Sequence, residues 1–552
     1  MAVDSEVARE ISPVLTPKQL ARLQPYGSRE TAAKGTLLFD EGDHSIDFFV
    51  VLTGAVEICQ YTDGGMRRVV RPGPGQFIGD PSTLTGRAAV VQARADEDSE
   101  VLRIPADRFQ RIVVEDSELS DLFLRTFLLR REALIEGNFG SIKVVGSRYS
   151  RDTHRIREFL TRNSQPHVFL DVEKDQGVSA LLDRLGVGVE EVPIVMCREL
   201  HISRNPSDAK LAHALGFDLI VESDLCDVVV VGAGPAGLAA SVYAASEGLT
   251  VTAIDHGSPG GQAGTSSKIE NYLGFPTGIS GQELAQRAMT QAVKFGTRMA
   301  NPVEAVGLER KGVDYEVRFS DGRRAQGRSV VIATGAKYQR LDVPDADRYE
   351  GCGLYYGATA MESELCAGAD VLVVGGGNSA GQGAVYLARY ARSVHILVRR
   401  DGLAETMSRY LIRRIEETPN IHLHPRSEIT RLIGDGQRLR TVEYKDQSAG
   451  KTVRIETPSV FLFLGARPCT HWLRGTVALD AKGFIKTGPD LEPEELAGHA
   501  RDSVRPPSLF ETSLPRVYAV GDVRSGSVKR VASAVGEGSI VVQFIHRALN
   551  GE

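Results

Sequence analysis

The sequence has few of the features that mark disulfide, metal or membrane proteins. Its six cysteines are scattered along 552 residues, and none forms a Cys-x-x-Cys pair or has metal-ligand spacing with a histidine. No apolar run of about 18 residues occurs without a charge or a glycine-rich turn inside it, so we expect no transmembrane helix. The first residues, Met1 to Glu6, lack the basic and apolar regions of a signal peptide. We therefore expect a cytoplasmic protein without a metal site or structural disulfides.

The charge balance also argues against one broad class of partner. A net charge of −6 provides no general attraction for nucleic acid or for an anionic membrane. The shares of hydrophobic residues, 42%, and of charged residues, 25%, are those of a soluble globular protein. Because a single core stops growing well below this length, the chain should form about three or four domains.

What the sequence does contain is a nucleotide-binding pattern near its middle. An apolar segment over residues 227–231 leads into the turn 232–237, GAGPAG, and an alanine-rich segment follows. A second apolar segment, 251–254, ends at Asp255. This order of strand, turn, helix and strand seats a pyrophosphate on the N-terminus of the helix, and an acid at the end of the second strand accepts ribose hydroxyls. The pattern predicts a site for FAD.

A second copy of the pattern follows further along the chain. Residues 370–374 precede the turn 375–380, GGGNSA, and the next apolar segment, 394–398, leads directly to Arg399 and Arg400. An arginine pair at this position accommodates a 2′-phosphate, so the second copy predicts a site for NADPH. Because each copy has the expected strand, helix and terminal residue around its glycines, we favour two nucleotide sites over two glycine-rich turns without ligands.

The N-terminal block, residues 1–136, predicts a β-barrel or jelly roll followed by a helix. Short alternating strands at 35–39, 48–52 and 55–58 are separated by glycine turns. Residues 115–136 have apolar side chains near helical spacing, which predicts an amphipathic helix.

Three segments of this block carry a resemblance to a known family. Residues 34–43, residues 49–57 and the segment 77–89, FIGDPSTLTGRAA, together resemble a cyclic nucleotide-binding domain. The resemblance implies that an acid accepts the ribose 2′-hydroxyl and that an arginine holds the cyclic phosphate of cyclic AMP or cyclic GMP. The site implied in this way consists of Gly79, Asp80, Arg87 and Ala88.

Two departures from that family leave an alternative open. Asp80 stands where glutamate is usual, and the segment 77–89 is shorter than in familiar members. A barrel that is retained only for packing or dimer contacts is the alternative to a nucleotide sensor. No helix-turn-helix follows the barrel, which argues against a transcription factor.

The middle block, residues 137–222, alternates strands and helices. Strands are expected at 142–146, 167–172 and 192–196, with helices at 153–160 and around 180–182. The block resembles the thioredoxin/glutaredoxin fold, including a Val-Pro dipeptide whose proline is cis in that family. The family's Cys-x-x-Cys position reads Ser150 to Thr153, so thiol exchange is excluded there. We interpret the block as a redox-inactive spacer, dimer surface or docking module, and Cys197 as a core residue rather than a reactive thiol.

The C-terminal block, residues 223–552, carries further motifs besides its two glycine-rich turns. These are GGQ at 260–262, IENY at 269–272, ATG at 333–335, VRRDG at 398–402 and AVGDV at 519–523. With them the block resembles thioredoxin reductase over essentially its whole length. The resemblance implies a homodimer and an NADPH domain that is inserted into the FAD domain and rotates between two orientations.

The complete expectation is a multidomain protein with two Rossmann-like three-layer domains after the barrel and the thioredoxin-like α/β domain. The expected domains are 1–136, 137–222, an FAD domain formed by 223–345 and 470–552, and an NAD(P)H domain over 346–469. The expected FAD site contains Gly232, Gly234, Pro235, Ala236, Gly237, Asp255, Gly261, Gln262, Asn271, Thr334, Gly335, Gly521, Asp522, Arg530 and Val531. The expected NADPH site contains Gly375, Gly377, Asn378, Ser379, Ala380, Arg399, Arg400 and Gly465. A helix after Lys529 would direct its positive N-terminus at the reduced flavin.

The dithiol that defines thioredoxin reductase is missing. The family's Cys-Ala-Thr-Cys motif reads Gly357-Ala358-Thr359-Ala360 here, and its following acid is Met361. Cys352 and Cys366 lie on opposite sides of this segment and are poor candidates for a substitute disulfide, which needs Cα atoms within about 7 Å. No residue is therefore assigned as catalytic with certainty.

These observations leave three functional readings. The first is an FAD-dependent NADPH oxidoreductase that passes electrons to an external acceptor, a small molecule or a redox protein, under the control of a cyclic nucleotide. The second is a nonenzymatic flavin and NADPH redox sensor, and the third is a thioredoxin-disulfide reductase that uses an atypical thiol. NADH is an alternative donor, because Val398 replaces the family's histidine and Ala404 lies near its further arginine.

Overall fold

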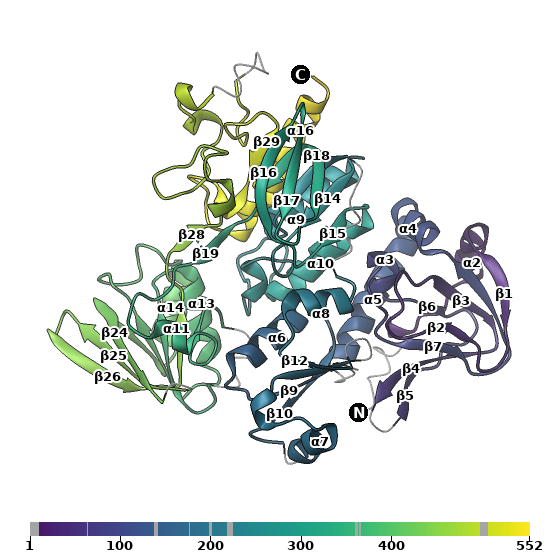
Figure 1. The fold of residues 1–552 in the computed structure, drawn as a ribbon, viewed down its shortest axis with the longest axis horizontal. Coiled ribbons are helices and arrows are strands. Elements are labelled where there is room, and N and C mark those ends of the chain that lie inside the picture. Colours follow the sequence, from purple (N-terminus) through teal and green to yellow (C-terminus); the bar gives the residue numbers. More distant parts are fainter. Residues whose placement is uncertain are drawn as a thin grey trace. The chain divides into compact units, whose positions relative to one another are not determined.

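The computed structural model describes residues 10–551 apart from 63–64, 137–141, 176, 198–200, 218–224, 359–362, 364–365, 436–437 and 497–505. The chain forms two compact units, whose helices and strands are labelled in Figure 1. The first unit consists of Met1–Ser147, Ile156–Val221 and Thr290–Val303. The second consists of Arg148–Arg155, Glu222–Met289 and Glu304–Glu552.

The N-terminal part of the first unit contains two four-stranded antiparallel sheets, in agreement with the expected barrel or jelly roll. One sheet has the order β1 (Ser28–Ala32), β8 (Ser99–Ile104), β3 (Phe48–Thr53) and β6 (Phe77–Ile78). The other has the order β2 (Leu37–Phe39), β7 (Gln92–Ala95), β4 (Val56–Thr62) and β5 (Gly65–Val70). The strands expected at 35–39, 48–52 and 55–58 are confirmed, with shifted ends.

The helices α2 (Pro17–Leu23), α3 (Pro81–Thr85), α4 (Ala106–Glu115) and α5 (Ser117–Glu136) accompany these sheets. A buried aromatic cluster joins the last two helices to the first sheet, through Phe48, Phe77, Phe109, Phe123 and Phe127. The start of the helix expected over 115–136 was wrong. Asp116 has an extended backbone that ends α4, and its carboxylate accepts a hydrogen bond from the Leu119 amide at 3.1 Å near the start of α5.

The following module has one mixed four-stranded sheet, in the order β10 (His167–Asp171), β9 (Ile142–Gly146), β11 (Ile194–Cys197) and β12 (His201–Arg204). β9 and β10 are parallel, whereas β11 is antiparallel to both β9 and β12. Its helices are α6 (Arg151–Arg162), α7 (Val178–Leu185) and α8 (Asp208–Ala214). The Val192–Pro193 peptide bond is cis, and Cys197 is buried in its strand, as expected.

The second unit contains most of a seven-stranded sheet. Its parallel strands are β14 (Val251–Ile254), β13 (Cys226–Val231), β18 (Arg324–Ile332) and β29 (Val517–Ala519). β17 (Asp314–Phe319) and β16 (Ala305–Lys311) continue from β18 as an antiparallel extension. The main helices are α9 (Pro235–Ser246), α10 (Gly281–Lys294) and α16 (Val531–Leu549). The strands before both glycine-rich turns and the helix after Lys529 are therefore confirmed.

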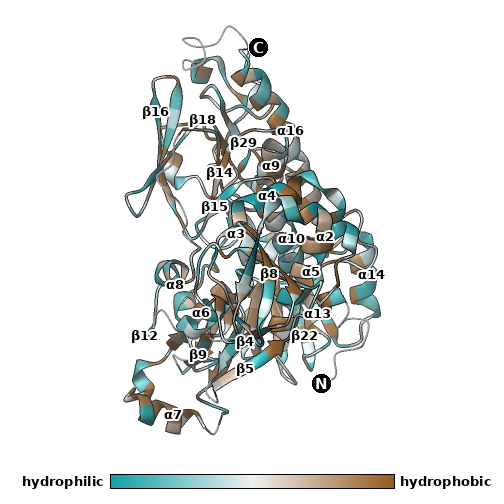
Figure 2. Ribbon diagram, turned by 90° about the vertical axis from the view of Figure 1, so that its right-hand side faces the viewer, coloured by the Kyte–Doolittle hydropathy of each residue, from teal (hydrophilic) through white to brown (hydrophobic). Residues whose placement is uncertain are grey.

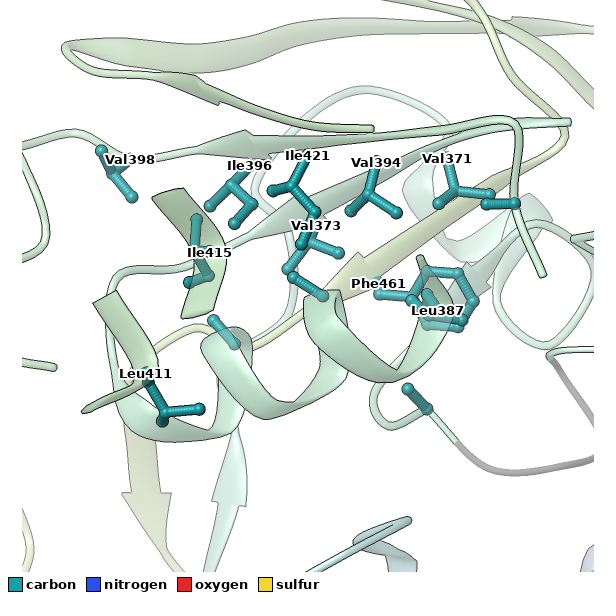
Figure 3. Close-up of a cluster of buried hydrophobic side chains, with 14 of the residues drawn as sticks. Val371, Val373, Leu387, Val394, Ile396, Val398, Leu411, Ile415, Ile421 and Phe461 are labelled. Carbon is teal, nitrogen blue, oxygen red and sulfur yellow. The ribbon is translucent and has the colours of Figure 1, made fainter. Parts of the chain in front are cut away.

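A second parallel sheet has the order β20 (Leu354–Tyr355), β27 (Ser459–Leu462), β21 (Asp370–Val374), β22 (Ser393–Leu397) and β23 (Ile421–His424). One face packs against α13 (Asn378–Leu387) and α14 (Arg409–Glu417), and Figure 3 shows this core around Val373, Ile396 and Phe461. Along α14, hydrophobic and hydrophilic residues alternate in Figure 2, as its amphipathic packing requires. The other face packs against β24 (Ser427–Gly434), β25 (Leu439–Asp446) and β26 (Lys451–Glu456).

Two short strands connect the segments that carry these two sheets. β19 (Ala336–Tyr338) and β28 (Ala466–Pro468) form an antiparallel ribbon, with Tyr338 opposite Ala466. The chain enters the second parallel sheet after β19 and leaves it through β28, as expected for an inserted domain. Among the described residues, no helix is long and apolar enough to cross a membrane.

Candidate functional site

The first glycine-rich turn has the geometry that brings a ligand close to the backbone. A Cβ on Gly232 would lie 2.3 Å from the Ala333 carbonyl oxygen, and a Cβ on Gly237 would lie 1.8 Å from the Gly232 carbonyl oxygen. Gly234 begins α9 without a side-chain cap, and a Cβ there would meet only the Gly261 Cα, at 3.9 Å. Backbone amides at the start of α9 therefore face an open glycine cradle, which fits the pyrophosphate of FAD.

Asp255 is held at the end of β14, beside this turn. It is buried, and its two carboxylate oxygens accept hydrogen bonds from the amides of Ala233, at 2.7 Å, and Gly257, at 2.8 Å. This arrangement positions the carboxylate next to the glycine cradle, where the sequence places the ribose of FAD.

Two further groups of expected FAD residues come from distant parts of the chain. Gln262 donates a hydrogen bond to the Ala336 carbonyl of the ribbon, and Thr334 donates one to the Cys469 carbonyl at 3.0 Å. Asp522, in a short turn before α16, has its pKa raised mainly by burial, while nearby Lys529 opposes the rise. Asn271 is exposed.

The N-terminus of α16 has no side-chain cap at Arg530, so its first amides are available to a ligand. Gly538 lets α16 approach α9 closely, because a Cβ there would lie 2.1 Å from the Ala236 carbonyl oxygen. A half-buried ion pair between Arg524 and Glu537 (2.6 Å) lies at the same end, and Glu537 also accepts the Gly521 amide hydrogen bond at 2.7 Å. Sequence reasoning missed this pair, since nothing in the local pattern links the two residues.

The second glycine-rich turn repeats the geometry of the first. A Cβ on Gly375 would lie 2.5 Å from the Phe463 carbonyl oxygen, and Gly377 begins α13 without a side-chain cap. Asn378 uses its side-chain oxygen to accept the Ser408 amide hydrogen bond at 2.7 Å. Ser379 hydrogen bonds with the Tyr338 hydroxyl of the ribbon, a contact that the sequence did not indicate. The turn fits the pyrophosphate of a pyridine nucleotide.

The arginine pair lies at the end of β22, as expected. Arg399 and Arg400 are exposed, with 71% and 58% of their side-chain surface accessible. Arg399 is 3.9 Å from Glu428, and Arg400 forms an ion pair with Glu405. Gly465, the last of the expected NADPH residues, accepts the Gln339 amide hydrogen bond at 2.7 Å and so lies beside the ribbon.

The segment that replaces the family's dithiol lies beside residues 265–266, shortly after the expected FAD residue Gln262. Ala358 forms a β-bridge with Ser266, and a Cβ on Gly357 would be 3.5 Å from the Thr265 side chain. Ala360 and Met361 lie outside the described residues. None of the six cysteines is in a disulfide, so Cys352 and Cys366 do not form the substitute pair. Burial raises the pKa of the Cys352 thiol, which opposes the thiolate form that redox chemistry requires.

In the N-terminal unit, Asp80 is the centre of a buried polar cluster. Its carboxylate accepts the Ser82 amide hydrogen bond at 2.8 Å, at the start of α3, and forms an ion pair with Arg131 of α5 at 2.9 Å. The two side chains of that pair are only 8% and 10% exposed. A Cβ on Gly79 would lie 3.0 Å from the Phe127 ring, so this turn also packs against α5.

Arg87 belongs to the same cluster. Its guanidinium lies over the Phe217 ring, 4.3 Å from the centroid, and donates a hydrogen bond to the Asn301 side chain at 3.2 Å. Burial first, and then the charge of Arg131, lowers the pKa of Arg87 to about 9. The Ala88 carbonyl accepts a hydrogen bond from the Ser82 hydroxyl at 3.2 Å. The structure thus brings Gly79, Asp80, Arg87 and Ala88 together and adds Arg131, which the sequence did not suggest.

Comparison with known proteins assigns the barrel and the C-terminal block of the chain. Residues 226–538, more than half of the sequence, match the pyridine nucleotide-disulphide oxidoreductase family. The chain belongs to this family. Residues 29–116 match the cyclic nucleotide-binding domain, which identifies the barrel.

Relatives of the flavoprotein part agree with the assignment. Thioredoxin reductase of Bacillus subtilis is 29% identical over 59% of this chain and 95% of its own length. NADPH-dependent thioredoxin reductase 3 of Arabidopsis thaliana is 30% identical over 58% of this chain, but the match covers only 58% of that protein. The crystal structure of T. acidophilum thioredoxin reductase matches 59% of this chain with 31% identity and a TM-score of 0.53. The protein is therefore an NAD(P)H-dependent FAD oxidoreductase of the thioredoxin reductase type.

Proposed function

We propose that this oxidoreductase passes electrons from NADPH through FAD to an external acceptor, without a dithiol of its own, and that its cyclic nucleotide-binding domain regulates the transfer. When bound, FAD supplies a centre that accepts a hydride from the nicotinamide. The remaining parts of the proposal concern what this chain's own residues do around that centre.

The observation that carries the proposal is the segment at Gly357. It lies beside Thr265, in the short 3-10 helix Ala263–Thr265 that follows the expected FAD residue Gln262, yet it presents a glycine where the family has a cysteine. None of the six cysteines is in a disulfide that could take part in thiol exchange. A glycine at this place offers no thiol to the flavin, so in this proposal the electrons leave to an acceptor that is not part of the protein.

An anaerobic titration with NADPH tests the absence of an internal dithiol. Full bleaching of the flavin absorbance near 450 nm with one equivalent of NADPH per FAD is expected, because the flavin would be the only two-electron centre. A requirement for two equivalents would reveal a hidden disulfide and favour the atypical-thiol reading. Titration of the denatured protein with a thiol reagent, before and after reduction, provides the independent count of disulfides.

The donor preference rests on Arg399 and Arg400. Their exposed guanidinium groups at the end of β22 suit the 2′-phosphate of NADPH, and NADH lacks that group. We therefore propose NADPH as the preferred donor. Equal kcat/KM values for NADH and NADPH would refute this preference without affecting the assignment to the family.

The regulatory part of the proposal rests on the polar cluster of the barrel. Asp80 is fixed by the Ser82 amide and by Arg131, so its carboxylate is oriented before a ligand arrives. Arg87 contacts Phe217 and Asn301, both beyond the barrel in the sequence. A cyclic phosphate on Arg87 would compete with these contacts, which provides a physical route from ligand to the rest of the unit.

Turnover with and without cyclic AMP or cyclic GMP tests this regulation. A coupling free energy of about 1–3 kcal/mol corresponds to a change of several-fold to about a hundredfold in affinity. Calorimetric binding of each nucleotide to the wild-type protein and to R87A separates binding from coupling. If the wild-type protein binds neither nucleotide, the barrel is retained for packing. If it binds one of them but its turnover does not change, the domain is a nucleotide site that does not regulate electron transfer.

The middle module supports a structural rather than a redox role. We propose that it has the thioredoxin/glutaredoxin fold, and its strand order, its antiparallel β11 and β12 and the cis Val192–Pro193 bond support this assignment. Ser150 and Thr153 occupy the positions where that fold carries its reactive cysteines. We propose that it acts as a spacer or docking module, in a cytoplasmic homodimer.

The sensor reading makes a different kinetic prediction. A protein that only reports its redox state would reoxidise over minutes, whereas an enzyme supplied with its proper acceptor should exceed about 1 turnover per second. Oxygen, quinones, ferredoxin-like proteins and protein disulfides form the panel of acceptors. The absence of a disulfide among the six cysteines, four of which are buried, favours the enzyme with an external acceptor over a thiol-based reductase.

A further inference from the structure

The proposed NADPH preference leaves one position unexplained. The thioredoxin reductase pattern expects a further arginine near residue 404, where this chain has alanine. Ala404 is exposed and has no group that could bind a phosphate. Two arginines alone would then have to distinguish NADPH from NADH.

The structure brings a third arginine, Arg426, beside the Arg399–Arg400 pair from a different element. After β23 the chain runs beside the continuation of β22. The Val398 amide donates to the His424 carbonyl at 3.1 Å, the Ser427 amide donates to the Val398 carbonyl at 2.9 Å, and the Arg426 amide donates to the Arg400 carbonyl at 3.0 Å. The backbone of Arg426 is thus hydrogen-bonded to that of Arg400, although Arg426 lies 26 positions further along the chain.

The backbone of Arg426 is fixed on both sides. Its amide is held by Arg400, and its carbonyl accepts the Gln447 amide hydrogen bond at 3.0 Å. Its φ of 48° lies in the left-handed region, which is uncommon for a residue other than glycine. Such a conformation persists only where neighbouring contacts hold it, so the Cα of Arg426 has a fixed position.

The side chain of Arg426 points to the loop that follows the arginine pair. Its Nε donates a hydrogen bond to the Asp401 carboxylate, and 55% of the side-chain surface is exposed. An arginine carries five N–H donors, so the bond to Asp401 orients the guanidinium and leaves its outer edge for another acceptor. Asp401 is therefore a positioning residue for Arg426.

We propose that Arg426 is the third arginine that binds the 2′-phosphate of NADPH, in place of the side chain missing at Ala404. In this proposal Arg399 and Arg400 reach the phosphate from the segment after β22, and Arg426 reaches it from the turn between β23 and β24. The nearby carboxylates of Asp401, Glu405 and Glu428 partly neutralise this group, and exposed ion pairs of this kind are weak enough for a phosphate to compete. The inference rests on the proposed preference for NADPH.

The test measures binding of two fragments that differ only in the phosphate. Calorimetry of the FAD-loaded protein compares 2′,5′-ADP with 5′-AMP, in the wild type, R426A and R399A. R426A should bind 2′,5′-ADP about tenfold more weakly and bind 5′-AMP unchanged, because it removes one charge-assisted contact to the phosphate. The KM for NADPH should rise to a similar extent, while kcat and the KM for NADH stay the same.

Two further variants make the result specific. R413A removes an exposed arginine of α14 that pairs with Glu417 at 2.8 Å, and should change neither affinity. Adding A404R to R426A should restore much of the affinity for 2′,5′-ADP, because it returns an arginine to the loop. The flavin spectrum of each variant shows that the protein is folded.

The outcomes separate this inference from the proposed donor preference. Loss of 2′,5′-ADP affinity in R399A but not in R426A would overturn the role of Arg426 and leave the NADPH preference intact. Equal weakening of both fragments in R426A would mean that Arg426 only shapes the loop, which also overturns the inference. If the wild type does not distinguish 2′,5′-ADP from 5′-AMP, both proposals are wrong.

Discussion

Restoring the missing dithiol is the most direct test of how this protein uses its flavin. The double variant G357C/A360C recreates the Cys-Ala-Thr-Cys motif of thioredoxin reductase at residues 357–360. At Gly357 the structure has space for the change: the nearest atoms to a new Cβ belong to Thr265 at 3.5 Å, an ordinary van der Waals contact. Gly357 is also absent from the set of residues with positive φ, so a cysteine meets no backbone strain there.

The double variant should take up two more electrons per FAD than the wild type. The wild type should bleach with one equivalent of NADPH per FAD, and the oxidised double variant with two, because a disulfide adds one two-electron centre. Anaerobic titration followed at the flavin absorbance measures both values. The variant G357S/A360S is the matched control, since serine has nearly the size of cysteine but forms no disulfide, and it should stay at one equivalent.

One result would refute the reasoning. If mass spectrometry shows that the disulfide in G357C/A360C has formed, yet the flavin still bleaches at one equivalent, the segment at 357–360 does not exchange electrons with the flavin. The contact between Gly357 and Thr265 would then have no redox meaning, and the search for the acceptor site would move elsewhere on the protein.

Three further predictions concern stability and cofactor retention. R131M should lower the free energy of local opening at residues 77–90 by about 3 kcal/mol, since it leaves the buried Asp80 carboxylate without its partner; hydrogen exchange that is unchanged there would contradict this. G237A should yield protein without FAD, because its Cβ would lie 1.8 Å from the Gly232 carbonyl oxygen, and a normal flavin spectrum would disprove the close approach. Burial, followed by the charges of His424 and His422, lowers the pKa of His395 from 6.5 to about 4, whereas Asp370 opposes the shift. Because the unfolded chain takes up this proton at a higher pH than the folded protein, acid favours unfolding. The free energy of unfolding should therefore fall by about 1–2 kcal/mol as the pH drops from 6.5 towards 4, after allowance for solvent screening. H395Q should flatten this part of the stability profile, and an identical slope in the variant would assign the effect to other groups.

The local parts of both nucleotide sites could be predicted from the sequence because their signals are short-range. Each turn lies between an apolar strand and a helix, and the residues that close it, such as Gly232 and Gly237, are neighbours along the chain. Asp255 and the Arg399–Arg400 pair follow from the fixed length of one strand–helix–strand unit. These residues needed no knowledge of the rest of the fold.

Residues that meet across long sequence distances could not be found in this way. Arg131 pairs with Asp80 from 51 positions away, and Arg87 reaches Asn301 from 214 positions away. Neither partner belongs to a motif, and an arginine on an amphipathic helix ordinarily indicates a solvated face. Their roles emerge only from tertiary packing, as does the position of Arg426 beside Arg400.

The helix expected over 115–136 illustrates a second kind of error. Apolar spacing continues from α4 into α5, so periodicity alone does not mark the break between them. The signal was present in the capping chemistry, because Asp116 is a good N-cap residue and Ser117 begins the second helix. Boundaries of this kind depend on one side chain, whereas the existence of the helix depends on many.

The ribbon of β19 and β28 gives the protein an internal optical probe. The only tryptophan in the chain, Trp472, follows β28 by four positions and lies in a short turn over His471–Leu473. β19 and β28 are the two connections to the expected NAD(P)H domain. A rotation of that domain would therefore twist the segment between β28 and Trp472. Tryptophan emission overlaps flavin absorption, and energy transfer between them depends steeply on their separation. Stopped-flow fluorescence of the unlabelled wild-type protein therefore tests whether this part rotates during turnover, at the same time as the flavin colour reports electron transfer.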